Sequence, residues 1–120
     1  MNTNSPAILI VSRDDDRAFT LTCRRALEAE GYRTYHAQSL GLAVDRAFMY
    51  RPELIVLDPS FTDIEQTAFI DCLHETDPAI QILCLRCPIP PRTLLRECKS
   101  ILTAHPGSEN VHGFEYARAS

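Results

Sequence analysis

The sequence predicts a three-layer α/β domain in which helices cover both faces of a doubly wound parallel sheet. Four candidate strands alternate with four segments whose apolar residues recur at helical spacing. The runs AILIV at residues 7–11 and LIVL at residues 54–57 are apolar throughout, as expected of strands that are covered on both faces. Strands separated by helices form parallel sheets with right-handed crossovers, which places helices on both faces.

The candidate strands differ in polarity. Residues 7–11 form a continuous apolar run, residues 54–57 form the third candidate strand, and residues 80–85 the fourth. The stretch YRTYHA at residues 32–37 is polar enough for a sheet edge.

Each of the four helical segments is expected to bury an apolar stripe. The stripes are Phe19, Cys23, Ala26 and Leu27; then Leu40, Val44, Ala47 and Phe48; then Ile64, Ala68, Cys72 and Leu73 with Phe69 beside them; and Leu94, Leu95, Cys98, Ile101 and Leu102. Local signals mark the helix ends. Gly31 is expected to follow the first helix, Ser39 to cap the second, and Pro91 to open the fourth, while Asp77 and Pro78 end the third.

Length and composition indicate one domain. The chain has 120 residues, of which 45% are apolar and 23% charged, a balance that supports a single core. Residues 1–102 are expected to form the domain, and residues 103–120, which contain HPGS, a C-terminal tail.

Charge and hydropathy exclude several classes of protein. The net charge is −4, and eleven arginines and one lysine form no basic block, so no direct nucleic-acid partner is expected. No apolar run approaches the roughly 18 to 20 residues of a membrane span, and the N-terminus lacks a signal-peptide pattern. The protein is expected to be cytoplasmic, without a membrane partner.

Five cysteines lie scattered through the apolar segments, a pattern that favours reduced thiols over a disulfide scaffold. Cys84 and Cys87 form a C-x-x-C pair, which could serve as a redox couple or as half of a zinc site. No second such pair and no histidine at ligand spacing accompanies them, so we interpret both as small apolar residues of the core.

Carboxylates follow two of the candidate strands. Asp58 ends the run LIVL, and Asp14–Asp16 follow the run AILIV shortly after its end. Ligands of open α/β sheets bind outside the carboxyl ends of the strands, where the strand order reverses. In a sheet of order 2-1-3-4 the first and third strands are neighbours, so these carboxylates are expected to share one crevice. Two simpler alternatives stay open: Asp58 caps a turn, and Asp14–Asp16 form the acidic start of a helix.

A shared crevice of carboxylates has a chemical consequence. Several carboxylates repel one another unless a hard divalent cation such as Mg²⁺ lies among them. With the ion in place, Asp58 could attack a phosphoryl donor, and the metal would neutralise charge on the transferring group.

The segments ILIV with its aspartate cluster, ALEAEGYRTYHA and PELIVLD resemble the receiver domain of bacterial two-component response regulators over residues 7–102. The resemblance implies a flavodoxin-like fold of receiver type, strand order 2-1-3-4, with Asp58 as the phosphoacceptor. It also implies that Mg²⁺ is held by two of Asp14–Asp16, taken as Asp14 and Asp15, by Asp58, and by the backbone carbonyl of Ser60.

The resemblance further implies a signalling role and not an enzyme. A histidine kinase or phosphotransfer protein is the implied phosphoryl donor, and an effector protein the implied downstream partner. Homodimerisation stays open.

Several positions depart from the family pattern. Ser12 and Arg13 stand where the family has its acidic pair, unless two residues are inserted before Asp14. Thr62 and Gln66 replace the proline and glycine that the family usually has after the phosphoacceptor.

The switch positions depart as well. Cys87 takes the place of the family's strand-end lysine in one alignment, and Arg86 that of its threonine or serine in the other. The single lysine, Lys99, lies within the last helical segment. The chain is also expected to lack one of the family's five strand–helix units. Two functions therefore stay open: a receiver phosphorylated at Asp58, or a pseudo-receiver that binds partners without phosphorylation.

Overall fold

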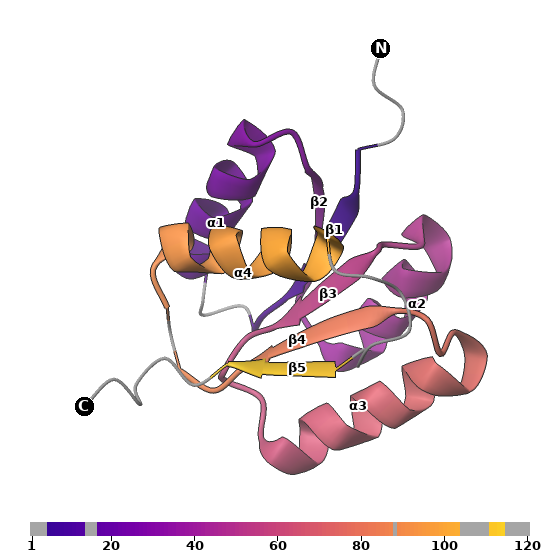
Figure 1. Ribbon diagram of the computed structural model, residues 1–120. Helices are drawn as coiled ribbons and strands as arrows, with labels where there is room; N and C mark the ends of the chain where they lie inside the picture. Colours follow the sequence, from indigo (N-terminus) through magenta and orange to yellow (C-terminus); the bar gives the residue numbers. More distant parts are fainter. Residues whose placement is uncertain (1–4, 14–16, 88, 104–110, 115–120) are drawn as a thin grey trace.

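The computed structural model describes residues 5–13, 17–87, 89–103 and 111–114 (Figure 1). Five strands and four helices lie within these residues. In chain order they are β1 (Ala7–Val11), α1 (Arg17–Ala29), β2 (Arg33–Ala37), α2 (Leu40–Tyr50), β3 (Leu54–Leu57), α3 (Asp63–Thr76), β4 (Gln81–Leu85), α4 (Pro91–Thr103) and β5 (Val111–Phe114). None of the helices described is long and apolar enough to cross a lipid bilayer.

The strands form one parallel sheet of order β2-β1-β3-β4-β5. The predicted order 2-1-3-4 and the predicted edge position of β2 are confirmed. The expectation of a missing strand is wrong, because β5 pairs with β4, with Val111 opposite Ile82. This strand comes from residues that we expected to form a tail. Its four residues include Gly113, which weakens the sequence signal for a strand. The residues described contain no fifth helix.

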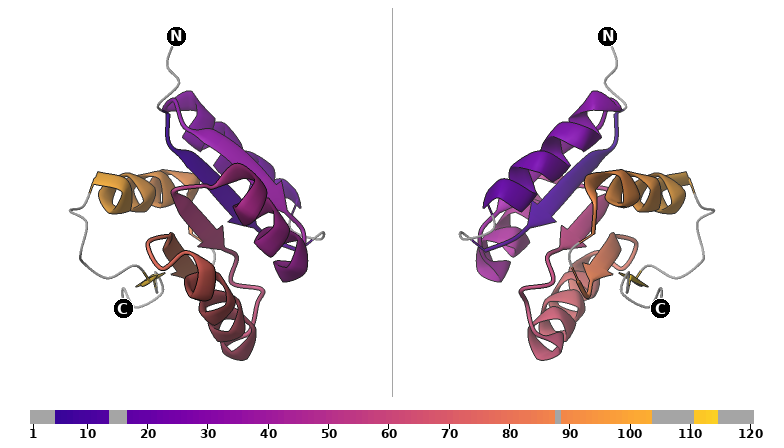
Figure 2. Two further views of the ribbon diagram at one scale, coloured as in Figure 1. Left: turned by 90° about the vertical axis from the view of Figure 1, so that its right-hand side faces the viewer. Right: turned by 90° about the vertical axis from the view of Figure 1, so that its left-hand side faces the viewer.

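Helices cover both faces of the sheet (Figure 2). One core lies between the sheet and α1 and α4, and the other between the sheet and α2 and α3. The first includes Ile8, Ile10, Cys23, Leu27, Leu54, Val56, Leu83, Leu85, Ile89, Leu94, Cys98 and Ile101. The second includes Leu9, Val11, Ala37, Ala43, Ala47, Ile55, Leu57, Phe61, Phe69, Leu73, Ile80, Ile82 and Cys84. The three-layer class is thus confirmed.

One connection differs in hand from the others. Both α3 and α4 link strands in the same direction along the sheet, yet α3 packs beside α2 and α4 packs beside α1. The β4-α4-β5 connection therefore has the opposite hand to β3-α3-β4. Crossovers of one hand, the right, are the rule in parallel sheets, so this last unit is exceptional.

Helix ends follow the predicted signals. Ser39 caps α2, and its hydroxyl accepts a hydrogen bond from the backbone N–H of Leu42 at 3.1 Å. Gly31 follows α1 with a φ of +96°, a backbone conformation that residues with side chains rarely adopt. Helix α4 begins at Pro91.

The predicted stripes of α1 and α4 face the core, but that of α3 is largely wrong. Its buried residues are Gln66, Phe69 and Leu73, and Ile64 is 83% exposed. Helix α3 has apolar residues on more than one side, so periodicity alone did not identify the side that packs. Phe48, expected in the buried stripe of α2, is 54% exposed.

Arginines contact the outer edge of β2. The carbonyls of Thr34 and His36 point away from β1. The residues that alternate with them in β2 form the hydrogen bonds to β1. Arg24 of α1 donates to the Thr34 carbonyl at 3.4 Å, and Arg46 of α2 donates to the His36 carbonyl at 2.5 Å.

Candidate functional site

The carboxyl ends of β1 and β3 lie side by side. Val11 pairs with Leu57, so Ser12 and Asp58 follow at the same level of the sheet. The backbone N–H of Asp58 donates to the carbonyl of Val11 at 3.0 Å. The predicted adjacency of the two strands is confirmed. Residues 14–16 lie outside the residues described, so the positions of Asp14, Asp15 and Asp16 stay predictions.

Asp58 is buried at this edge, with 3% of its surface exposed. Its Oδ1 accepts a hydrogen bond from the backbone N–H of Ser60 at 3.3 Å, and its carbonyl accepts one from Phe61 at 3.4 Å. These bonds form the tight turn that follows β3. Burial, and to a lesser degree the Asp58 carboxylate, raise the pKa of Cys23 to about 12. The thiol of Cys23 is therefore neutral at ordinary pH.

Ser12 is fully buried directly after β1. Its hydroxyl contacts the hydroxyl of Thr20 in α1 and lies 2.9 Å from Nε2 of His36. This group of polar side chains joins β1, α1 and β2. Sequence reasoning missed it, because the three residues are far apart in the chain and none belongs to a recognised motif.

Arg13 reaches across to the start of α3. Its guanidinium lies 3.1 Å and 3.2 Å from the two carboxylate oxygens of Glu65 and 4.7 Å from the centre of the Phe61 ring. Glu65 also accepts from the backbone N–H of Thr62, whose hydroxyl accepts from Glu65 N–H in return, a capping box. The Thr62 bond first, and then Arg13, lower the pKa of Glu65. The T-x-x-E spacing was a sequence signal for this cap that our prediction did not use.

Arg86 and Cys87 follow β4 at the same edge of the sheet. Nη1 of Arg86 lies 3.3 Å from Oδ1 of Asp63, in the first turn of α3. Cys87 is half-buried, while Cys84 lies buried in the core, where burial raises the pKa of its thiol. All five cysteines are free thiols. The geometry thus favours the interpretation of Cys84 as a core residue.

Two arginines therefore connect the sheet edge to the first turn of α3. Arg13 comes from the end of β1 and binds Glu65, while Arg86 comes from the end of β4 and binds Asp63. Both ion pairs are partly exposed. Asp58 lies at the end of β3, the strand between β1 and β4 in the sheet.

The carboxylates predicted to hold a divalent cation lie partly outside the residues described. No three histidine, cysteine, aspartate or glutamate side chains among the residues described come together as a metal site. A hydroxyl and a guanidinium, from Ser12 and Arg13, directly follow β1, and the carboxylates that the resemblance implies as metal ligands, Asp14 and Asp15, lie outside the residues described. A role of the Ser60 carbonyl as a metal ligand stays a prediction.

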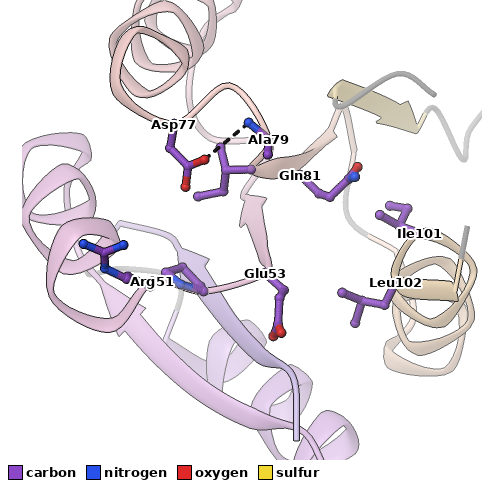
Figure 3. Close-up of a pocket in the computed structure, with 9 residues that line it drawn as sticks. Arg51, Glu53, Asp77, Ala79, Gln81, Ile101 and Leu102 are labelled. Atoms are coloured by element: carbon purple, nitrogen blue, oxygen red, sulfur yellow. Dashed lines mark hydrogen bonds between the residues drawn. The ribbon is translucent and has the colours of Figure 1, made fainter. Parts of the chain in front are cut away.

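A hollow lies at the amino ends of the strands, away from Asp58 (Figure 3). It has a volume of about 370 Å³. Both carboxylates among its lining residues bind backbone: Glu53 accepts from Ala7 N–H at 2.8 Å, and Asp77 from Ala79 N–H at 3.3 Å. These bonds join β3 to β1 and shape the turn before β4, so we interpret both carboxylates as structural.

Comparison with solved structures identifies receiver domains as similar folds. A CheY-like response regulator receiver domain protein from Methanospirillum hungatei is 23% identical, with a TM-score of 0.71, and the match covers 82% of this chain and 94% of that one. The chemotaxis response regulator CheY4 of Vibrio cholerae is 17% identical, with a TM-score of 0.71 and coverage of 82% and 99%. The receiver domain of the hybrid histidine kinase CckA is 20% identical, with a TM-score of 0.68 and coverage of 81% and 99%. No family model and no curated protein sequence matches the chain.

Proposed function

We propose that this chain, which has the fold of response-regulator receiver domains, is a signalling module that binds partner proteins without phosphorylation of Asp58. The observation that carries the proposal is the pair of residues after β1. Ser12 is buried among Thr20 and His36, and Arg13 binds Glu65. Neither residue supplies the carboxylate that a metal-assisted transfer to Asp58 requires.

Charge explains why those carboxylates matter. Transfer of a phosphoryl group to Asp58 would place further negative charge on a carboxyl group with 3% exposure. A divalent cation held by neighbouring carboxylates neutralises such charge. Arg13 carries one positive charge, and its guanidinium is already paired with Glu65 over the Phe61 ring.

The missing lysine supports the same proposal. The resemblance calls for a lysine at a strand end beside the phosphoacceptor. The single lysine, Lys99, lies on α4, and its ammonium group is 3.2 Å from Glu30. At the end of β4 the chain has Arg86 and Cys87 instead, and Arg86 binds Asp63.

The second candidate is a phosphorylated receiver. Asp58 favours it, because a carboxylate stands at the end of β3 at the level of the β1 loop. In that case Asp14 and Asp15 would hold Mg²⁺, and a histidine kinase or phosphotransfer protein would supply the phosphoryl group. In either case the role is binding and signalling and not turnover of a substrate. The five free thiols favour a reducing compartment, such as the cytoplasm.

Intact-mass measurement distinguishes the two candidates. The chain is incubated with acetyl phosphate over a range of Mg²⁺ concentrations, beside an active receiver domain as positive control. We expect no gain in mass. A gain of one phosphoryl group that disappears in Asp58→Asn would overturn the proposal and establish the second candidate.

A further inference from the structure

Helix α3 presents an apolar stripe to solvent. Ile64, Ala68 and Cys72 recur every four residues, so they lie on one side of the helix, and all three are exposed, Ile64 to 83%. The sequence predicted this stripe to be buried. The core is instead filled from the other side of the helix, by Phe69 and Leu73. The stripe is therefore spare apolar surface on a helix that is already packed.

Helix α2 adds to this surface. Phe48 is 54% and Met49 68% exposed, and Leu42 is also exposed. Helices α2 and α3 are neighbours on the same face of the sheet (Figure 1). We call the exposed side chains of Leu42, Phe48 and Met49 in α2 and of Ile64, Ala68 and Cys72 in α3 the α2–α3 surface. Large exposed apolar side chains of the described residues gather on these two helices, with Leu21 of α1 as the exception. Exposed apolar side chains on two neighbouring helices are candidates for an interaction site.

The charges on these two helices are mostly negative. Asp71 and Glu75 are exposed next to the stripe of α3, and Asp45 is exposed on α2. Helix α3 contains no lysine or arginine. The one arginine of α2, Arg46, is occupied with the carbonyl of His36. At the start of α3, Glu65 and Asp63 are paired with Arg13 and Arg86, so the negative charge beside the stripe comes mainly from Asp71 and Glu75.

We propose that the α2–α3 surface binds an amphipathic helix of a partner protein, with leucine-like residues on its apolar side and lysine or arginine flanking them. The apolar side would cover Met49 and Ile64, and the basic residues would face Asp71 and Glu75. This inference rests on the proposed function, since partner binding is the role proposed there. A second copy of the chain is the competing occupant, because α4 exposes basic side chains of its own, Arg92 and Arg96.

The binding test uses two synthetic peptides of about 18 residues, long enough for a stable helix. One combines leucine and lysine in an amphipathic pattern, and the other has glutamate in place of every lysine. Titration of the full chain is followed by calorimetry, and amide chemical shifts are followed by NMR. We expect the lysine peptide to bind and to change the chemical shifts of amides in α2 and α3. Its affinity should fall as added salt screens the charges. The glutamate peptide is expected not to bind.

Variants locate the site. Met49→Ala with Ile64→Ala is expected to weaken binding by about fivefold or more, the loss typical of truncated contact residues. Asp71→Lys with Glu75→Lys should remove the preference for the lysine peptide. Leu21→Ala is the matched control, since Leu21 is 50% exposed on the other face, and it should change affinity less than about twofold.

Three results would overturn the inference: equal binding of both peptides, shifts confined to α1 and α4, or an unchanged affinity of the Met49 and Ile64 variant. A dimer that this variant dissolves would identify the second copy as occupant and overturn it too. Absence of both a phosphoryl gain and peptide binding would refute this inference and leave the proposed function standing. A phosphoryl gain together with site-specific peptide binding would refute the proposed function and leave this inference standing.

Discussion

Carboxylates introduced directly after β1 should give the chain a new response to Mg²⁺. The change is Ser12→Asp with Arg13→Asp. Because Val11 pairs with Leu57, position 12 lies level with Asp58. The two new carboxylates would then stand beside the one at the end of β3, a set of oxygen ligands that a divalent cation prefers.

Two opposing effects set the size of the response. Ser12 is fully buried and contacts Thr20 and His36, so its loss should cost about 1–3 kcal/mol, and the carboxylates would also repel one another. Mg²⁺ at ten times its dissociation constant would restore about 1.4 kcal/mol, from RT ln 11. The unfolding entropy of a 120-residue chain is about 0.25 kcal/mol/K, so the melting temperature should rise by about 5 to 6 °C.

Thermal unfolding followed by circular dichroism, with and without MgCl₂, measures this shift. The double variant should melt lower than the natural chain without Mg²⁺ and recover with it. The natural chain should not respond, and Asp58→Asn in the double variant should abolish the recovery. A comparable rise in the natural chain would refute the reasoning, because it would mean that Asp14 and Asp15 already complete a metal site.

Three other predictions test the packing and the electrostatics. Leu94→Ala should lower the free energy of unfolding by about 2–5 kcal/mol in urea denaturation, since the side chain is fully buried. Ile64→Ala should change this free energy by less than about 0.5 kcal/mol, because Ile64 is exposed. Equal losses in the two variants would contradict the placement of α4. Timed alkylation read by mass spectrometry should label exposed Cys72 quickly at pH 8 and Cys23 only on unfolding, because the latter is buried with a pKa raised to about 12; equal rates would disprove this. Because the pKa of Glu65 is lowered in the folded chain, Glu65 should stabilise the fold above its unfolded pKa of about 4.3, and this contribution should be lost as the pH falls through the folded pKa. Glu65→Gln should reduce the loss of stability in acid titrations followed by circular dichroism. An unchanged titration profile would contradict this role of Glu65.

The central strands could be predicted because little else fits them. The runs at residues 7–11 and 54–57 are apolar on both faces, which only a covered parallel strand requires. The strand β5 could not be predicted, since VHGF is short, contains glycine, and becomes a strand only through pairing with β4. Its formation depends on contacts that are distant in sequence.

The packed side of α3 was hidden for a different reason. Helical spacing shows which side chains share a side, and α3 has apolar residues on two sides. Phe69 and Leu73 are the side chains of α3 that pack against the sheet, and which side of the helix packs depends on tertiary contacts with the strands.

The candidate site was predictable only in part. The place of Asp58 follows from its position at the end of an apolar run. The pairing of Arg13 with Glu65 joins residues that are 52 positions apart, and no local pattern connects them. Of these contacts, only the cap formed by Thr62 and Glu65 has a recognisable sequence spacing, T-x-x-E.

The arginines that contact the edge of β2 limit how the molecule can associate. An incoming strand needs acceptor carbonyls, and those of Thr34 and His36 already receive bonds from Arg24 and Arg46. Extension of the sheet past β2 would first have to displace both guanidinium groups. Recognition on that flank is therefore expected to depend mainly on side-chain chemistry, and the two arginines should hinder the edge-to-edge strand pairing that begins aggregation.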